Sequence, residues 1–229
     1  MKRIPSSLCL LGLPLLTLVA NAAEPRYSLA GTPLEVVTSE AKYLPFAQAV
    51  RADADRLLAS PTPPSADQLA LLLAIRVHLA HHFREDDVAL ALAARIRDRQ
   101  TNPADKAFAG LTTKAAVAAR RQTGEKPGNP AFGKVFASEF RRFLGELPGT
   151  PEIRAMLVVQ RDKIAGLTRE TLLAETREKI SPAIEQRGFC GLPEADQLVR
   201  VHHRLTDILP VKPETLRGLE EAIAARSRR

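Results

Sequence analysis

Prolines at the start of apolar-periodic stretches constrain this fold more than any other feature of the sequence. Seven prolines each open a stretch whose apolar residues recur at three- and four-residue spacing, namely Pro45, Pro103, Pro130, Pro151, Pro182, Pro193 and Pro213. Proline suits the first turn of a helix, because the N–H group that it lacks would have no partner there. Several follow good N-cap residues, as in Asn102-Pro103, Asn129-Pro130, Thr150-Pro151 and Ser181-Pro182. The sequence therefore predicts an all-α protein.

The same pattern predicts about nine or ten short to medium helices, packed as antiparallel pairs or as an irregular α-solenoid-like stack. Their expected ranges are 45–59, 66–84, 87–100, 103–121, 130–147, 151–166, 169–180, 182–187, 193–209 and 213–226. The clearest apolar face is a phenylalanine stripe made of Phe132, Phe136, Phe140 and Phe143. Such a stripe is typical of a helix face that packs into a core. Residues 34–37 have the character of a short strand, but the sequence offers that strand no partner.

The first 22 residues have the features of an export signal. Lys2 and Arg3 give a positive start, residues 8–20 are almost all apolar, and residues 20–22 (Ala-Asn-Ala) supply the small side chains that a signal peptidase reads. Cleavage is expected before Ala23. The apolar run is shorter than the roughly 20 residues that span a bilayer as a helix. We therefore expect an exported protein, periplasmic or extracellular, whose mature form has no transmembrane helix.

Cleavage would remove 22 of the 229 residues and leave 207, enough for one ordinary core or two small ones. Residues 122–129 (QTGEKPGN) are expected to link a helical half over 23–121 to another over 130–229. Whether these halves are separate domains stays open. The net charge of +7 becomes +5 without the two basic residues of the signal, a mild excess that permits contact with anionic envelope polymers. The chain has no tryptophan and no aromatic residues interleaved with basic ones, so nucleic acid is not an expected partner.

Three histidines near the end of the 66–84 helix form the sharpest local feature. His78 and His82 are one turn apart, His81 flanks them, and Glu85 continues the row if the helix runs that far. Imidazoles at this spacing, with a carboxylate, can bind Zn²⁺, Ni²⁺ or Cu²⁺. With about 3.6 residues per turn, the histidines fall opposite the apolar face, which predicts that they are exposed to solvent. The two interpretations are a surface metal site and an ordinary polar face, and no HExxH or CxxC motif supports the first.

Arg76 lies inside the apolar stripe of the same helix and is a candidate buried charge. A buried arginine needs a carboxylate partner, whereas one that reaches the rim of the core does not. Asp53 and Asp55 on the preceding helix are the candidate partners. We expect a structural role for this arginine.

Cys190 would be the single cysteine left after signal cleavage, so it cannot form a disulfide within the mature chain. A free thiol of this kind is either a small buried hydrophobe or a reactive group. His202, at the edge of an apolar face, follows it in sequence, whereas His203 is expected to point away. A nucleophilic pair needs the base within hydrogen-bond reach and a third group to orient it, and the sequence shows neither.

No catalytic or cofactor motif is present in the sequence: there is no GxSxG elbow, phosphate loop, dinucleotide fingerprint, EF-hand loop or CxxCH. We therefore expect a non-enzymatic exported helical protein, without a cofactor, that binds another protein or an anionic envelope polymer. The alternatives are a metal-binding protein that uses the three histidines and Glu85, and a Cys190-dependent enzyme or redox protein.

Overall fold

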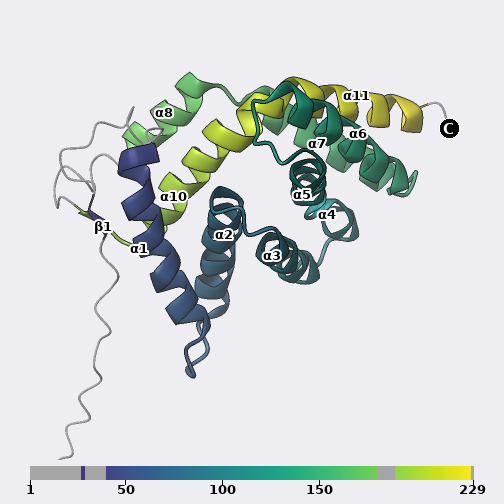
Figure 1. The fold of residues 1–229 in the computed structure, drawn as a ribbon. Coiled ribbons are helices and arrows are strands. Elements are labelled where there is room, and N and C mark those ends of the chain that lie inside the picture. Colours follow the sequence, from purple (N-terminus) through teal and green to yellow (C-terminus); the bar gives the residue numbers. More distant parts are fainter. Residues whose placement is uncertain (1–26, 29–39, 180–188, 228–229) are drawn as a thin grey trace, which may run out of the picture.

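The computed structural model of the protein describes residues 27–28, 40–179 and 189–227 (Figure 1). Over these residues the protein is all-α, as the sequence predicts. The export signal, the strand-like residues 34–37 and the expected helix 182–187 lie outside the described residues. No helix in the described part of the chain combines the length and apolar character needed to cross a membrane.

Short turns connect most of the successive helices. They are α1 (Glu40–Leu58), α2 (Ala66–His82), α3 (Asp86–Asp98), α4 (Pro103–Phe108), α5 (Leu111–Thr123), α6 (Pro130–Glu146), α7 (Pro151–Ala165), α8 (Arg169–Lys179) and α10 (Leu192–His203). A π-helical turn, η2 (Arg204–Ile208), and a 3-10 turn, η3 (Leu209–Val211), then lead into α11 (Lys212–Ser227). Two short strands, β1 (Tyr27–Ser28) and β2 (Phe189–Cys190), pair antiparallel with Tyr27 opposite Cys190.

Three of the predicted N-caps form as expected. The side chain of Asn102 accepts hydrogen bonds from the N–H groups of residues 104 and 105 at the start of α4. Asn129 and Thr150 cap α6 and α7 in the same way. In each case a proline occupies the first helical position, so the cap and the proline together satisfy or remove N–H groups that the helix leaves unpaired.

Two predicted helix boundaries are wrong. Helix α1 begins at Glu40 rather than at Pro45, because Tyr43 and Phe46 pack into the core on both sides of the proline and the helix continues through it. The expected helix 103–121 is interrupted before α5, where Gly110 has a φ of 80°. A Cβ atom at Gly110 would lie 3.2 Å from the Cβ of Ala93, so both the backbone conformation and the space favour glycine.

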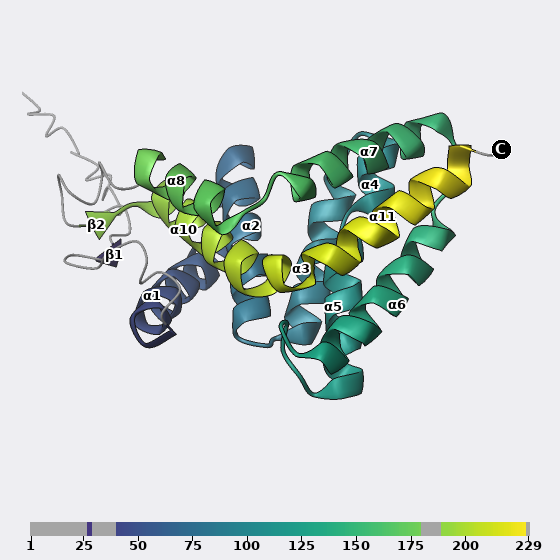
Figure 2. The same ribbon diagram turned by 90° about the horizontal axis from the view of Figure 1, so that it is seen from above.

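The last helices form one continuous run from α10 through η2 and η3 to α11, rather than two separate helices (Figure 2). This run follows the length of the molecule. Its first part packs on α1, α2 and α8, and its last part packs on α6 and α7. It therefore joins two regions that are built from different parts of the chain.

Each of the two largest cores combines residues from both sides of residues 122–129. The first joins α1, α2 and α10 through Phe46, Leu72, Ile75, Leu79 and Leu198. The second joins α5, α6, α7 and α11 through Ala115, Phe136, Phe140, Leu157 and Leu219. Helices α5 and α6 pack along each other, so residues 124–129 form a turn between two packed helices. The two halves of the chain do not form separate cores.

Candidate functional site

All five histidines of the chain meet where the end of α2 faces the end of α10. The ring centroid of His203 lies 4.6 Å from that of His78 and 5.0 Å from that of His81. The rings of His82 and His202 are 5.1 Å apart by the same measure. We call these five residues the histidine cluster. The two groups lie far apart in the sequence, and only the packing of α10 on α2 brings them together.

The expectation that the histidines of α2 are exposed to solvent is wrong. Only 7% of the surface of His81 is exposed, because α10 covers this face of α2 while α1 and α3 cover others. His202, expected at the edge of an apolar face, is 4% exposed. His203, expected to point away, lies against the α2 histidines. A helical wheel assumes that each helix has one buried face. This assumption fails for α2, because other helices pack on several of its faces.

Tyr43 of α1 closes one side of the histidine cluster. Its ring stacks on that of His202 with centroids 3.5 Å apart, and it meets the ring of His82 edge-on at 5.0 Å. Tyr43 is almost fully buried. Burial, with a smaller effect from the negative charge of Asp207, raises the pKa of the Tyr43 hydroxyl, so this phenol stays protonated.

Asp207 supplies the acidic group of the cluster from the π-helical turn η2. Its Oδ2 accepts a hydrogen bond from Nδ1 of His203 at 2.9 Å. Burial alone would raise the pKa of Asp207, but the hydrogen bond from His203 and the neighbouring imidazoles outweigh it and lower the pKa to about 2. Asp207 is therefore a carboxylate held against a histidine. Single π-helical turns of this kind occur often at functional sites.

Three members of the cluster are uncharged at neutral pH. Burial, assisted by repulsion from His203, lowers the pKa of His81 to about 3 and that of His78 well below its ordinary value. Burial also lowers the pKa of His202 to about 3, with His82 adding to the effect. Nε2 of His81 lies 3.3 Å from the hydroxyl of Thr113, but an imidazole of such low basicity is a poor general base near neutral pH.

Arg76 is buried, and one of its two expected partners is confirmed. Its Nε lies 2.6 Å from Oδ1 of Asp55, and its guanidinium also pairs with Glu85 at 2.8 Å. Asp53 instead accepts a hydrogen bond from the hydroxyl of Tyr27 and two from Arg56. Because Arg76 is 5% exposed, these carboxylates balance a charge that would otherwise be costly to bury.

Glu85 does not join the histidines of α2. The helix ends at His82, and Arg84 takes a φ of 56°, which turns the chain away from the row. Glu85 pairs instead with Arg76 and Arg51. Among the described residues, no three His, Cys, Asp or Glu side chains are arranged to hold one metal ion. The predicted ligand set of three histidines and this carboxylate is thus not assembled in the structure.

Cys190 lies in β2, two residues before the start of α10. His202 lies ten residues along that helix from Leu192, which corresponds to about 15 Å at 1.5 Å per residue. The structure therefore places the backbone of the cysteine and the histidine at opposite ends of α10 and does not bring them together as a pair.

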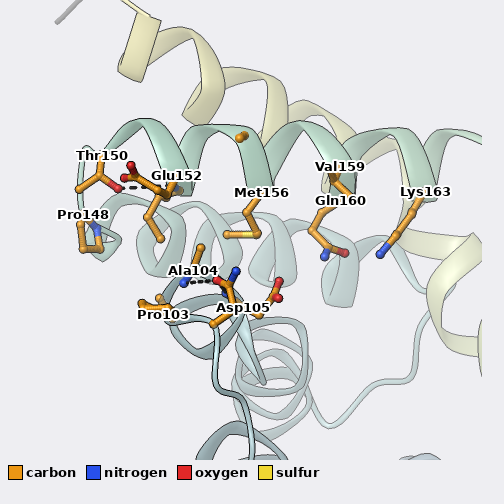
Figure 3. Close-up of a pocket in the computed structure, with 14 residues that line it drawn as sticks. Pro103, Ala104, Asp105, Pro148, Thr150, Glu152, Met156, Val159, Gln160 and Lys163 are labelled. Carbon is orange, nitrogen blue, oxygen red and sulfur yellow. Dashed lines mark hydrogen bonds between the residues drawn. The ribbon is translucent and has the colours of Figure 1, made fainter.

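A second feature is an open groove of about 870 Å³ between α4 and α7 (Figure 3). Its apolar lining includes Ile153, Met156 and Val159 of α7, together with Ala104 and Ala107 of α4. Figure 3 shows Met156 projecting from α7 toward the residues of α4. Val159 is 49% exposed, which makes it the most exposed large apolar side chain in the described part of the chain. The sequence did not predict this groove, because α4 was expected to be the start of a longer helix.

Comparisons of the chain with models of known protein families, with curated protein sequences and with solved structures found no match. Two features of the described residues have a geometry suited to binding. The histidine cluster is polar and largely enclosed, whereas the α4–α7 groove is apolar and open.

Proposed function

We propose that this chain is an exported, non-enzymatic helical protein of the cell envelope that binds a segment of another protein in the α4–α7 groove. The observation that carries the proposal is the exposed apolar lining, with Val159 at its open side and Met156 at its base. Exposed apolar surface bordered by polar residues is characteristic of protein interaction sites. The location in the envelope rests on the signal-like first 22 residues.

The length of the groove suits a short peptide segment. Glu152 and Lys163 both line it and are eleven residues apart on α7, which corresponds to about 16 Å along the helix. This distance matches about three turns of a partner helix or about five residues of an extended strand. An apolar groove of this size favours a protein segment over a uniformly charged envelope polymer.

Charged residues at the rim make the two ends of the groove opposite in charge. Glu152 lies toward one end and Lys163 at the other, and Asp105 lies between them, across from Met156 (Figure 3). A partner segment with an apolar centre, a basic residue at the first end and an acidic residue at the second would complement this arrangement. Such charges act mainly on the rate and orientation of binding rather than on its total strength.

Site-specific photo-crosslinking in cells that export the full chain tests this proposal. A photoreactive residue replaces Val159 in the groove, and in a second protein it replaces Val88 on α3, another exposed valine. We expect a discrete crosslinked protein from position 159 only, and we expect Met156→Glu to abolish it. The same products from both positions, or products that persist with Met156→Glu, would contradict a role for the groove.

Binding of a transition-metal ion by two of the clustered histidines, rather than by the set of three histidines and Glu85 that the structure does not assemble, is the second candidate function. It is favoured by the uncharged state of His81 and His202, because metals bind the neutral imidazole, and by a buried Nδ1 atom of His78 that has no hydrogen-bond partner among the described residues. Calorimetric titration with Zn²⁺, Ni²⁺ and Cu²⁺ tests it. Tight one-to-one binding that His78→Ala/His82→Ala removes would support a metal site, and binding unchanged by the variant would exclude it.

A further inference from the structure

A cleft of about 360 Å³ opens beside the histidine cluster and is separate from the α4–α7 groove. Four parts of the chain line it: the end of α2, Arg84 in the turn that follows, Arg120 of α5 with the loop at Lys126, and the η2 region. The cleft lies within the size range of small-molecule sites in proteins. Its lining residues come from far apart in the sequence, so it exists only in the folded protein.

The charge of the cleft is predominantly positive. Arg84 and Lys126 line it, both are exposed, and neither forms an ion pair within the described residues. Arg120 adds a third cation, held in place by Asp86 at 2.7 Å and by the carbonyl of His81. Asp207 is the single acidic residue of the lining, and it is already paired with His203. An anion entering the cleft would meet two uncompensated cations.

A smaller pocket of about 130 Å³ adjoins the cleft and has a different character. The two share His81, Arg120, Pro127 and Asp207, but the smaller pocket is also lined by Ala116, Phe132, Phe136 and Val211. Two phenylalanine rings and aliphatic side chains supply the apolar part of this inner pocket, and Thr112, Thr113 and His203 also line it. An apolar cavity of about 150 Å³ can hold one benzene ring, so the inner pocket is close in size to a single ring or a branched alkyl group.

Two backbone irregularities border this site. Arg84 is the single non-glycine residue with a positive φ in the described part of the chain, and η2 is a π-helical turn. Residues held in uncommon backbone conformations concentrate at binding and active sites, where the surrounding structure maintains them. Here they provide a cation, Arg84, and a carboxylate, Asp207, to the lining of the same cleft.

We propose that this cleft binds a small organic anion, with its carboxylate near Arg84, Arg120 and Lys126 and a single apolar ring or branched alkyl group in the inner pocket. The site is independent of the protein-binding groove. The cationic mouth selects the charge, and the inner pocket lined by Phe132 and Phe136 selects the apolar group. Imidazole N–H groups at the cleft supply further donors to the carboxylate.

Calorimetric titration of the mature protein with benzoate, in buffer containing EDTA, tests the proposal. Three control ligands are titrated in the same way. Acetate lacks the ring, benzyl alcohol lacks the charge, and inorganic phosphate is charged but has no apolar group. We expect benzoate to bind at least about tenfold more tightly than any of the three. Equal binding of benzoate and phosphate would overturn the proposal, because it would show general attraction of anions, and so would absence of benzoate binding up to about 10 mM.

Variants separate the two parts of the site. Arg84→Gln/Lys126→Gln should weaken benzoate at least about tenfold, whereas Lys134→Gln on exposed α6 surface should leave it unchanged. Glutamine, like arginine, carries a side chain, so the positive φ at position 84 should be strained to a similar extent in the variant and in the unmodified protein.

Ala116→Leu fills the inner pocket and should remove the preference for benzoate over acetate. If circular dichroism shows that this variant does not fold, Thr112→Leu is a second variant that fills the pocket. Unchanged benzoate affinity in Arg84→Gln/Lys126→Gln, or an unchanged preference in a folded filling variant, would overturn the assignment.

Discussion

The continuous run from α10 to α11 packs against the rest of the protein in two different ways. Its first part meets α1 and α2 through the histidine cluster and Tyr43, and its last part meets α6 and α7 through phenylalanine and aliphatic side chains. Both interfaces are buried, but the first encloses neutral imidazoles, so we expect its stability to depend more strongly on protonation than that of the second. The histidine interface therefore combines buried polar groups with packing, whereas the interface with α6 and α7 rests mainly on apolar packing.

The apolar interface is the simpler of the two. Phe132, Phe136 and Phe140 lie in a row on α6, with successive ring centroids 6.1 and 5.6 Å apart and each ring at most 1% exposed. The polar interface contains apolar contacts as well, but it also buries the imidazoles of His81 and His202. Burying a polar group is unfavourable unless it has a partner. We therefore expect the stability of the polar interface, which contains the histidines, to change with pH.

The largest expected mutational effect lies in the apolar interface. Phe140→Ala would remove a fully buried ring between α6 and α11 and should lower the free energy of unfolding by about 3–5 kcal/mol. Phe143→Ala is the matched control on the same helix, because Phe143 is only partly buried and should cost about 1 kcal/mol or less. Urea unfolding monitored by circular dichroism measures both. Equal losses would contradict the assignment of the core face of α6.

Acid should act on the polar interface. In the folded protein the pKa values of His81 and His202 are about 3, below the value of about 6.5 in an unfolded chain. The unfolded chain therefore binds more protons below about pH 6.5, so the stabilisation is complete above that pH and is lost as the pH falls. Each of these histidines should cost about 2 kcal/mol between about pH 7 and pH 5.

The urea midpoint at the two pH values measures this loss. Phe140→Leu should retain the pH dependence of the unmodified protein, whereas His81→Gln/His202→Gln should reduce it. A midpoint that does not change between these pH values would show that the imidazoles are not buried in the neutral form.

Removal of the carboxylate in η2 should have a smaller effect. Asp207→Ala would leave Nδ1 of His203 without its acceptor and should cost about 1–3 kcal/mol. Asp98→Ala, which breaks an ion pair with Arg97 at the surface, should cost less than about 0.5 kcal/mol. Urea unfolding at neutral pH compares the two. A similar cost for both would mean that the pair in η2 contributes no more than a surface ion pair.

The smallest expected difference concerns two glycines near the apolar interface. A methyl group at Gly133 would meet no atom within 4 Å, so Gly133→Ala should stabilise the protein by about 0.5–1 kcal/mol through helix propensity. At Gly218 the added Cβ would lie 3.3 Å from Cδ1 of Phe140, and this contact should cancel the gain. Thermal unfolding of both variants tests the comparison. An equal gain at both positions would argue against close packing of α11 on Phe140.

Local features of the sequence were enough to predict most of the helices. Proline at the first helical position and caps such as Asn102 and Asn129 act within a few residues, so they can be identified from a single sequence. The phenylalanine stripe indicated the core face of α6, and its first three members are buried. Arg76 inside an apolar stripe indicated a buried charge, and Asp55 was among its predicted partners.

The candidate sites were not predictable in the same way. His78, His81 and His82 were predicted to lie on a solvent face because the sequence does not show that α10 packs on α2. The single turn at Arg84 then separates Glu85 from the histidines. The cleft depends on Arg84, Lys126 and Asp207, which no local spacing connects. The position of His202 at the edge of an apolar face was the one signal that could have suggested contact with another polar group.

An NMR titration of the imidazole groups tests directly whether α10 and α2 enclose neutral histidines. Spectra of protein labelled with ¹⁵N in histidine would be recorded from about pH 8 to pH 5, with assignments from single histidine substitutions. We expect the signals of His78, His81 and His202 to keep the shifts of neutral imidazole throughout this range. Titration of these three residues with midpoints near about 6.5 would contradict this expectation, because the imidazoles would then be exposed to solvent.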